Sequence, residues 1–560
     1  MAAASPFRCA LTADRGGFVR RFIRCVGAAA VAAPGSAGAA EFGDAVVLGP
    51  GVNPKIAVGQ AGEAVAVWQR PRRAPGVLVA AVRSWDGTWS APRTIGTIGP
   101  ADIARSTSMD VAVDGQGNAV VVWSQIRRVL PRRESVMTVR RTREGHWSAP
   151  RPLATFSSPS PDVDLGTAGR GLRPRVALDA NGAGVAVWAR LAGPEQPRVN
   201  PGDMRYVVDA AVMGADGRWS PPQTLGLTFS RPALDVTRAG DAAVLWTTLT
   251  VNEAGAHTST ELLAATRRVG GAWSPPELVV GDQAQPVDDY LSPPDNFTSV
   301  QGAIERDGGL TAIWKRGAGD NELQVASRAG AGPWSAPVTL DHRVDFSAPT
   351  LLGAANSGQV HAVWLGEPEQ DSNDAVLRAA TRDANGLWSA PTAAFGRSST
   401  VWTYLAHTAM SASGRVLALV VREQTGNGPP PYPRSHVEAY VRTPDGVWSH
   451  RHVLRHPKPQ PRSCASAFAA LADDDRGAAI WTCDAGTGHP TKVISATRAI
   501  VKCCGSVPER SQAATFSSVV VVLSSVTRMP SLNVAPASTS LTSSWPLNRR
   551  QRSCAASKSL

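Results

Sequence analysis

The sequence predicts an all-β protein, a β-propeller of about eight four-stranded antiparallel blades. Two motifs recur in step along the chain, one an apolar run that ends in tryptophan and the other built on Trp-Ser-Ala/Pro-Pro. From Trp68 to Trp481, seven intervals span 413 residues, a mean period of 59. A fixed period of this length with four short strand signals in each unit is typical of a propeller blade.

The apolar runs are the first of the two motifs. They occupy residues 64–68, 119–123, 184–188, 242–246, 310–314, 359–364 and 478–481, with an eighth copy at 415–421 in which Val421 stands where tryptophan is expected. The runs are apolar at nearly every position instead of alternating. We therefore expect strands that neighbouring blades cover on both faces.

The Trp-Ser-Ala/Pro-Pro motif predicts the outermost strand of each blade. It begins at Trp89, Trp147, Trp219, Trp273, Trp334 and Trp388, with a degenerate copy at Trp448. Each copy follows a turn signal such as Asp86-Gly87, which supplies the positive φ angles of a tight hairpin. Proline is tolerated on the outer edge of a sheet and not in its middle. Segments such as 174–179 and 262–267 complete the unit, which gives four strands a, b, c and d in chain order.

The two ends of the repeat region indicate how the ring closes. The last unit has strands at 465–472, 478–481 and 492–499, but no fourth strand follows. Residues 42–49 align with the fourth strand of the first blade, 89–96, so the strand that the last unit lacks is present at the other end of the repeat region. We therefore expect residues 42–49 to complete the last blade and close the ring. Closure removes the open edges of the stack.

Outside the propeller at 41–499, we expect an export segment at 1–40 and a disordered serine-rich tail at 500–560. Arg20-Arg21 precedes an alanine-rich stretch that ends in Ala37-Gly38-Ala39, which resembles a twin-arginine signal and indicates a secreted or cell-surface protein. A disordered leader is the alternative, and a frameshifted reading would also explain the tail. No apolar run is long enough to span a bilayer.

The net charge of +12 does not indicate nucleic-acid binding. Residues 1–40 carry +4 and residues 500–560 carry +6, which leaves only +2 for the repeat region. A basic face on the folded part would be the electrostatic footprint of a nucleic-acid protein.

Sequence variation between the repeats places the candidate binding site on one face of the ring. The b–c connections, such as 189–204 and 422–436, and the d–a connection 281–297 vary widely, whereas the a–b and c–d turns are short. The variable loops of blades 1 and 2 are basic, and that of blade 6 is acidic at 367–374. Arginine forks suit carboxylate or phosphate groups. The candidate ligand-binding residues are Arg70, Arg72, Arg73, Arg127 and Arg128. The alternative is that these loops are only solvated.

The repeat resembles the propellers of exported bacterial proteins described as sialidase-like or Asp-box-like. The Asp box reads Ser-x-Asp-x-Gly-x-Thr-Trp, and its nearest counterpart here, residues 84–89, lacks two spacer residues. The resemblance implies the propeller fold. A sialidase would also need three arginines, a tyrosine nucleophile paired with a glutamate, and an aspartate. The tyrosines are Tyr206, Tyr290, Tyr404, Tyr432 and Tyr440, with Asp288-Asp289-Tyr290 the nearest candidate segment.

These observations favour a non-catalytic, monomeric recognition module that binds an extracellular glycan or other polyanion, without a cofactor, a metal or nucleic acid. The alternatives are a sialidase-like glycoside hydrolase and a purely structural surface protein. Three smaller hypotheses concern a metal site at His450, His452 and His456, a solvated turn rather than a calcium loop at 473–475, and a disulfide between Cys464 and Cys483. The repeated tryptophans are framework residues, with stacking on sugar rings as the alternative.

Overall fold

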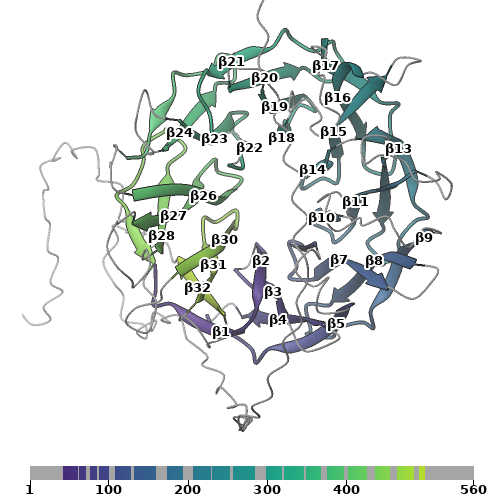
Figure 1. Ribbon diagram of the computed structural model, residues 1–560, viewed down its shortest axis with the longest axis vertical. Helices are drawn as coiled ribbons and strands as arrows, with labels where there is room; N and C mark the ends of the chain where they lie inside the picture. The colour runs from purple at the N-terminus through teal and green to yellow at the C-terminus, as the bar shows by residue number, and fades with distance from the viewer. Residues whose placement is uncertain are drawn as a thin grey trace, which may run out of the picture.

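The computed structural model describes residues 42–498 apart from 61, 71–75, 85–86, 100–107, 128–131, 159–172, 193–205, 229, 252–256, 284–297, 318–320, 346–347, 368–374, 396–400, 425–434, 455–462 and 485–490. Within these residues the chain forms eight four-stranded antiparallel sheets arranged in a ring (Figure 1). The predicted β-propeller and its eight blades are confirmed. The predicted export segment and tail lie outside the described residues.

Each blade is named here by its strands, from the innermost to the outermost. Blades 1 to 4 are β2 (Val52–Val58), β3 (Ala64–Arg70), β4 (Gly76–Arg83) and β5 (Arg93–Gly99); β6 (Met109–Val113), β7 (Ala119–Arg127), β8 (Arg132–Arg141) and β9 (Arg151–Ser158); β10 (Arg175–Leu178), β11 (Gly184–Leu191), β12 (Tyr206–Met213) and β13 (Gln223–Thr228); β14 (Ala233–Val236), β15 (Ala242–Val251), β16 (His257–Arg267) and β17 (Glu277–Gln283). Blades 5 to 8 are β18 (Thr298–Ile304), β19 (Leu310–Arg316), β20 (Glu322–Arg328) and β21 (Val338–Asp341); β22 (Leu351–Ala354), β23 (Val360–Gly366), β24 (Val376–Arg382) and β25 (Thr392–Ala393); β26 (Val401–Met410), β27 (Val416–Gln424), β28 (Ser435–Arg442) and β29 (His452–Leu454); β30 (Ser463–Leu471), β31 (Gly477–Asp484), β32 (Lys492–Arg498) and β1 (Val46–Pro50).

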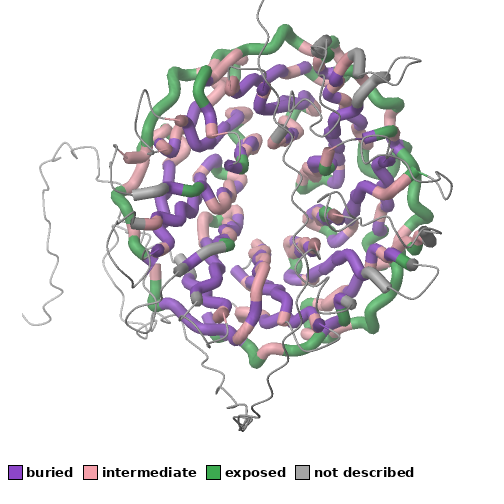
Figure 2. The backbone as a smooth tube through the Cα atoms, in the orientation of Figure 1, coloured by how far each residue is buried: buried purple, intermediate pink, exposed green. Residues whose placement is uncertain are grey.

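The ring closes as the sequence predicts. β1 pairs antiparallel with β32, with Val47 opposite Ile494, so the first described strand is the outer edge of blade 8. Around the axis, every innermost strand contacts the next, including β30 with β2. Burial follows this arrangement, since the middle strands of the blades are buried and the outer strands other than β1 are more exposed (Figure 2).

The repeated tryptophans of the b strands hold neighbouring blades together. All seven are completely buried, and the indole of Trp123 in blade 2 donates to the carbonyl oxygen of Thr97 in blade 1 at 3.0 Å. In blade 7, which lacks this tryptophan, a valine stands at the same position. The register of β26 with β27 pairs Met410 with Val416, which puts Val420 and not Val421 at the tryptophan position. The sequence prediction for this blade was one residue off, because adjacent valines give the same apolar pattern.

The serine of the Trp-Ser motif closes each c–d turn. In blade 1, the hydroxyl oxygen of Ser90 accepts from the backbone N–H of Val82 at 3.0 Å, and Gly87 has the positive φ that the sequence predicts. The same serine-to-backbone contact recurs in six further blades, through Ser148, Ser220, Ser274, Ser335, Ser389 and Ser449. The motif therefore stabilises the c–d turn, which agrees with a structural role for the repeated tryptophans.

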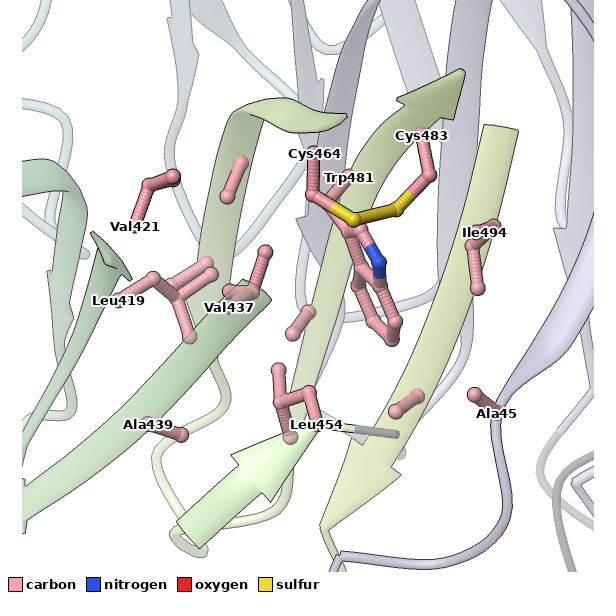
Figure 3. Close-up of a cluster of buried hydrophobic side chains, with 14 of the residues drawn as sticks. Ala45, Leu419, Val421, Val437, Ala439, Leu454, Cys464, Trp481, Cys483 and Ile494 are labelled. Atoms are coloured by element: carbon pink, nitrogen blue, oxygen red, sulfur yellow. A yellow bond between two sulfur atoms is a disulfide. The ribbon is translucent and has the colours of Figure 1, made fainter. Parts of the chain in front are cut away.

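The closing blade carries the predicted disulfide. Cys464 on β30 and Cys483 on β31 are directly opposite in the antiparallel register and are bonded, with their Cα atoms 4.1 Å apart. Figure 3 shows the pair beside Trp481 and Ile494, in the hydrophobic cluster between blades 7 and 8. The bond ties the two inner strands of the one blade that both ends of the repeat region build.

Candidate functional site

The candidate site consists of the residues at one equivalent position of the eight innermost strands. It lies three residues before the last residue of the a strand, always opposite the residue that precedes the tryptophan position of the b strand. We call its eight residues the axial row: Lys55, Asp110, Arg175, Ala233, Gln301, Leu351, His407 and Phe468. Because the strand register is the same in all eight blades, these residues lie at one level around the axis.

The charged members of the axial row converge across the axis. The pKa of Lys55 is lowered from 10.5 to about 8, first because the surrounding protein desolvates the ammonium and next because the cation of Arg175 is near. Arg231, at the start of blade 4, lowers the same pKa, and Asp110 opposes these effects. Blade 3 faces blade 7, and the pKa of His407 in blade 7 is lowered to about 3 by desolvation, then by Lys55 and Arg175.

Water nevertheless reaches this wall. Arg175 and Arg231 are exposed, and Lys55 and His407 are half-buried. Among the described residues that act on Lys55, two further cations and the carboxylate of Asp110 therefore lie near it inside the ring. The cations of Arg175 and Arg231 near Lys55 indicate a place where negative charge would be stabilised.

An aromatic ring separates two of these groups. The Nζ atom of Lys55 lies 3.9 Å from the centroid of the Phe468 ring, a cation–π contact, and the Phe468 and His407 rings are 5.0 Å apart. The Nδ1 atom of His407 accepts from the backbone N–H of Ala469 at 3.3 Å. His407 is therefore neutral near pH 7 and carries its proton on Nε2.

The carboxylates near the axis also join blades. Asp110 accepts from the backbone N–H of Val176 in blade 3 at 3.1 Å, and Asp235 accepts from that of Ile304 in blade 5 at 2.8 Å. Desolvation raises the pKa of Asp235 to about 6, and the hydrogen bonds oppose this change. Part of the acidic lining is thus used to bind neighbouring strands.

Backbone bulges with positive φ lie beside three axial-row residues. Asn53, Ser299 and Ser466 have φ angles of 50°, 51° and 48°, unusual for residues other than glycine. Each lies two residues before a member of the row, namely Lys55, Gln301 and Phe468, and the strand register shifts at all three places. Bulges re-aim side chains and are concentrated near functional sites. The side-chain amide of Asn53 donates to Gln69 at 3.2 Å, which supports this conformation.

Of the five arginines that the sequence predicts as ligand-binding residues, the structure describes the side chain of one. Arg70 ends β3 and is half-buried, with interactions of its own. Arg127 ends β7 opposite Arg133, but its side chain lies outside the described residues, as do Arg72, Arg73 and Arg128. The proposed basic sector of the variable loops thus stays a prediction.

The axial row was missed by the sequence interpretation, although a signal for it exists. In three blades, a charged residue stands at the same place of an otherwise apolar strand: Pro-Lys-Ile-Ala-Val with Lys55, Met-Asp-Val-Ala-Val with Asp110, and Pro-Arg-Val-Ala-Leu with Arg175. An alignment of the a strands by their turns would have shown the three charges at one level.

A tyrosine–glutamate pair exists, but away from the axial row. Tyr440 and Glu438 lie on β28, the third strand of blade 7, and the Tyr440 hydroxyl donates to the Glu438 carboxylate at 2.7 Å. Arg422 forms an ion pair with the same carboxylate at 2.9 Å, and Tyr440 is only 1% exposed. Burial and Glu438 raise the pKa of Tyr440, the opposite of an activated nucleophile. Tyr290 and Tyr432 lie outside the described residues.

The three smaller hypotheses have different outcomes. Cys464 and Cys483 form the expected disulfide. The described residues contain no group of histidine, cysteine, aspartate or glutamate side chains that could hold a metal, and of the three histidines His456 lies outside them. Residues 473–475 form an a–b turn, as expected, but Asp475 accepts from Ser411 and Arg415 of the preceding blade 7 instead of facing solvent freely. In the part of the chain that the structure describes, no helix could cross a membrane.

The fold and the axial row define an eight-bladed β-propeller with a cationic inner wall. No protein-family model matches the chain, and no curated protein sequence matches it. Among solved structures, it is similar to a polysaccharide lyase described as an ulvan lyase (11% identity, TM-score 0.41, covering 68% of this chain and 90% of that one). It is also similar to the NanB sialidase from Streptococcus pneumoniae (8%, 0.32, 81% and 94%) and to a protein of unknown function from Dyadobacter fermentans (12%, 0.36, 83% and 100%). At these identities and TM-scores the similarities give no argument about what this chain binds.

Proposed function

We propose that this protein is an exported recognition module that binds an anionic extracellular polymer, such as an acidic glycan, through its variable-loop face and without catalysis. The observation that supports the proposal is that Lys55, Arg175 and Arg231 lie close together around the axis, with the carboxylate of Asp110 nearby. Two of the three cations are exposed, so a ligand's carboxylate, sulfate or phosphate could replace water beside them.

The orientation of the strands supports entry from the variable-loop face. In each blade the a strand begins at a d–a connection and ends at a short a–b turn. The bulges at Asn53 and Ser466 lie between the axial row and the beginning of the strands. The bulges therefore lie on the side of the axial row that is nearer to the variable loops.

The aromatic and neutral members of the axial row suit a sugar better than a bare ion. Phe468 offers an apolar ring beside Lys55, and Gln301 on the opposite half of the row offers an amide donor and acceptor. Sites for polar organic ligands combine an apolar surface with a few placed polar groups. An acidic sugar unit has both an anionic group and a ring.

Direct binding measurements test this proposal. Calorimetry with short linear oligogalacturonates should show binding that weakens with added salt, because exposed charges are screened. Arg175→Ala and Arg231→Ala should each weaken it by about 1.5–3 kcal/mol, or roughly 10- to 150-fold, as for loss of a charged hydrogen bond. Arg218→Ala is the matched control, since Arg218 is 91% exposed in a c–d turn, on the face opposite the variable loops.

Three results would count against the proposal. It fails if neither uronate, sulfated nor phosphorylated polymers bind. It also fails if Arg218→Ala reduces affinity as much as Arg175→Ala does. Turnover of a fluorogenic sialoside would favour the glycoside hydrolase alternative instead.

A further inference from the structure

A pocket lies at the seam between blades 1 and 2, on the face opposite the variable loops. The a–b and c–d turns of the two blades form its wall, together with the ends of their c strands. Its volume is about 360 Å³, within the range of about 300–1,000 Å³ that is usual for small-molecule sites. No residue of the axial row lines it, so this pocket is separate from the candidate anion site.

The wall of the pocket carries donors and an acceptor. Arg83 and Arg141, the last residues of β4 and β8, line it and are partly exposed. Each also donates to the carbonyl oxygen of a turn glycine, Arg83 to Gly62 at 3.4 Å and Arg141 to Gly117 at 3.2 Å. The acceptor is Glu63. Desolvation lowers the pKa of Arg141, and the nearby carboxylate of Glu63 opposes this change.

Two polar groups in this wall lack partners. Among the described residues, the Oε2 atom of Glu63 is buried and has no hydrogen-bond partner. The same is true of the indole N–H of Trp89, which also lines the pocket and is 6% exposed. Buried polar groups are almost always paired, and one that is left alone costs free energy. The pocket thus has an acceptor and a donor that a bound molecule could satisfy.

Blade 4 has the same arrangement with its carboxylate paired. A pocket of about 490 Å³ at the seam between blades 4 and 5 is lined at the same repeat positions. There Asp241, Arg267, Trp273, Gly308 and Arg328 stand in place of Glu63, Arg83, Trp89, Gly117 and Arg141. Asp241 accepts from Arg268 at 2.8 Å and from the backbone N–H of Val269 at 2.9 Å.

The absence of a pairing cation beside Glu63 follows from one difference between the repeats. Blade 1 has Ser84 where blade 4 has Arg268, and the Ser84 hydroxyl donates to the carbonyl oxygen of Thr88 at 3.0 Å. The turns themselves do not require an acidic residue before the b strand. The other six blades have Asn118, Ala183, Gly309, Gln359, Arg415 and Arg476 at this position.

We propose that the pocket between blades 1 and 2 binds a single uncharged sugar unit. A hydroxyl group both donates and accepts, so one sugar ring can donate to Glu63 and accept from Arg83 and Arg141. An anionic group would bring a second negative charge beside Glu63, and an ammonium group would meet the two arginines. Trp89 adds an apolar part of the wall. This site is independent of the proposed function, which concerns anions on the opposite face.

Saturation-transfer NMR of the full-length protein with methyl glycosides of neutral hexoses tests this proposal. We expect saturation transfer to at least one of these glycosides. Glu63→Gln should weaken the binding of that glycoside by about tenfold or more, as for the loss of a charged hydrogen bond. Asp241→Asn makes the same change at the equivalent position of blade 4 and should leave the affinity unchanged.

A second pair of variants fills the pockets and leaves both carboxylates in place. Thr88 and Ala272 are exposed and stand at equivalent positions, one in each pocket. Thr88→Trp should abolish glycoside binding, and Ala272→Trp should not. The proposal is overturned if no neutral glycoside receives saturation, or if folded Glu63→Gln or Thr88→Trp protein binds as well as the parent. Arg175→Ala should bind the glycoside normally, so failure of this site and failure of the anion site are distinguishable.

Discussion

The indole N–H of Trp68 in blade 1 donates to the carbonyl oxygen of Pro50, the last residue of β1, at 3.1 Å. Since β1 is the outer strand of blade 8, this hydrogen bond joins the first complete blade to the blade that closes the ring. The Trp68 side chain is completely buried, in a cluster that also contains Val46 and Leu48 of β1. Closure therefore depends on packing between β1 and blade 1 as well as on the strand pairing with β32.

Removal of this side chain should destabilise the ring. We expect Trp68→Ala to lower the free energy of unfolding by about 3–5 kcal/mol, as for large-to-small changes at buried aromatic residues. Trp388→Ala is the control, because Trp388 belongs to a c–d turn and is only partly buried. Urea denaturation of the two variants checks the prediction. Equal losses would show that the closing seam has no special role.

The disulfide should stabilise the closing blade. The bond between Cys464 and Cys483 spans 19 residues, and a loop of this size corresponds to about 3 kcal/mol of restricted unfolded chain. Reduction should lower the melting temperature of the protein, and a Cys464→Ser/Cys483→Ser double variant should melt at that lower temperature with or without reductant. The interpretation is wrong if reductant has the same effect on the double variant.

The features of the fold that could be predicted from the sequence are those that a repeated or symmetric motif marks. The blade order, the closing strand and the cysteine pair were predictable because each repeats a motif or lies symmetrically about a hairpin. The axial row was not recognised, because Lys55, Asp110 and Arg175 are single departures in three separate repeats. Only the closed ring brings them to one level.

Long-range pairing and the loops set the other limits. Nothing near Arg238 or Asp473 in the sequence indicates that these residues, from the a–b turns of blades 4 and 8, form an ion pair. Val420 and Val421 are equivalent by composition, and only the hydrogen-bond register distinguishes them. The candidate arginines of the variable loops lie in segments whose length and composition differ from blade to blade, so the repeat gave no guide to their positions.

Anion binding should depend on pH through Lys55. Its pKa is lowered to about 8 in the folded protein, so its positive charge is lost as the pH rises from about 7 to 9. Affinity for an oligogalacturonate should fall over that range. Lys55→Arg keeps its charge and should remove most of the decrease. If the variant and the parent protein have the same pH profile, Lys55 does not contact the anion.

Asp235 should make stability depend on pH in the acid range. Its pKa is raised from 3.8 to about 6, so between these values the folded state holds more protons than the unfolded state. This group's contribution to stability is therefore present at low pH and is lost as the pH rises through 6. Asp235→Asn retains an acceptor for the N–H of Ile304 and should be more stable than the parent protein at pH 7. Equal stability of the two at pH 7 would contradict this account.

The central claim, that the inner wall of the ring binds an anion, is tested most directly by a crystal structure with a short linear oligogalacturonate. The account predicts a carboxylate of the ligand within hydrogen-bonding distance of Lys55, Arg175 or Arg231. A ligand bound elsewhere on the protein, with the axial row contacting only solvent, would contradict it.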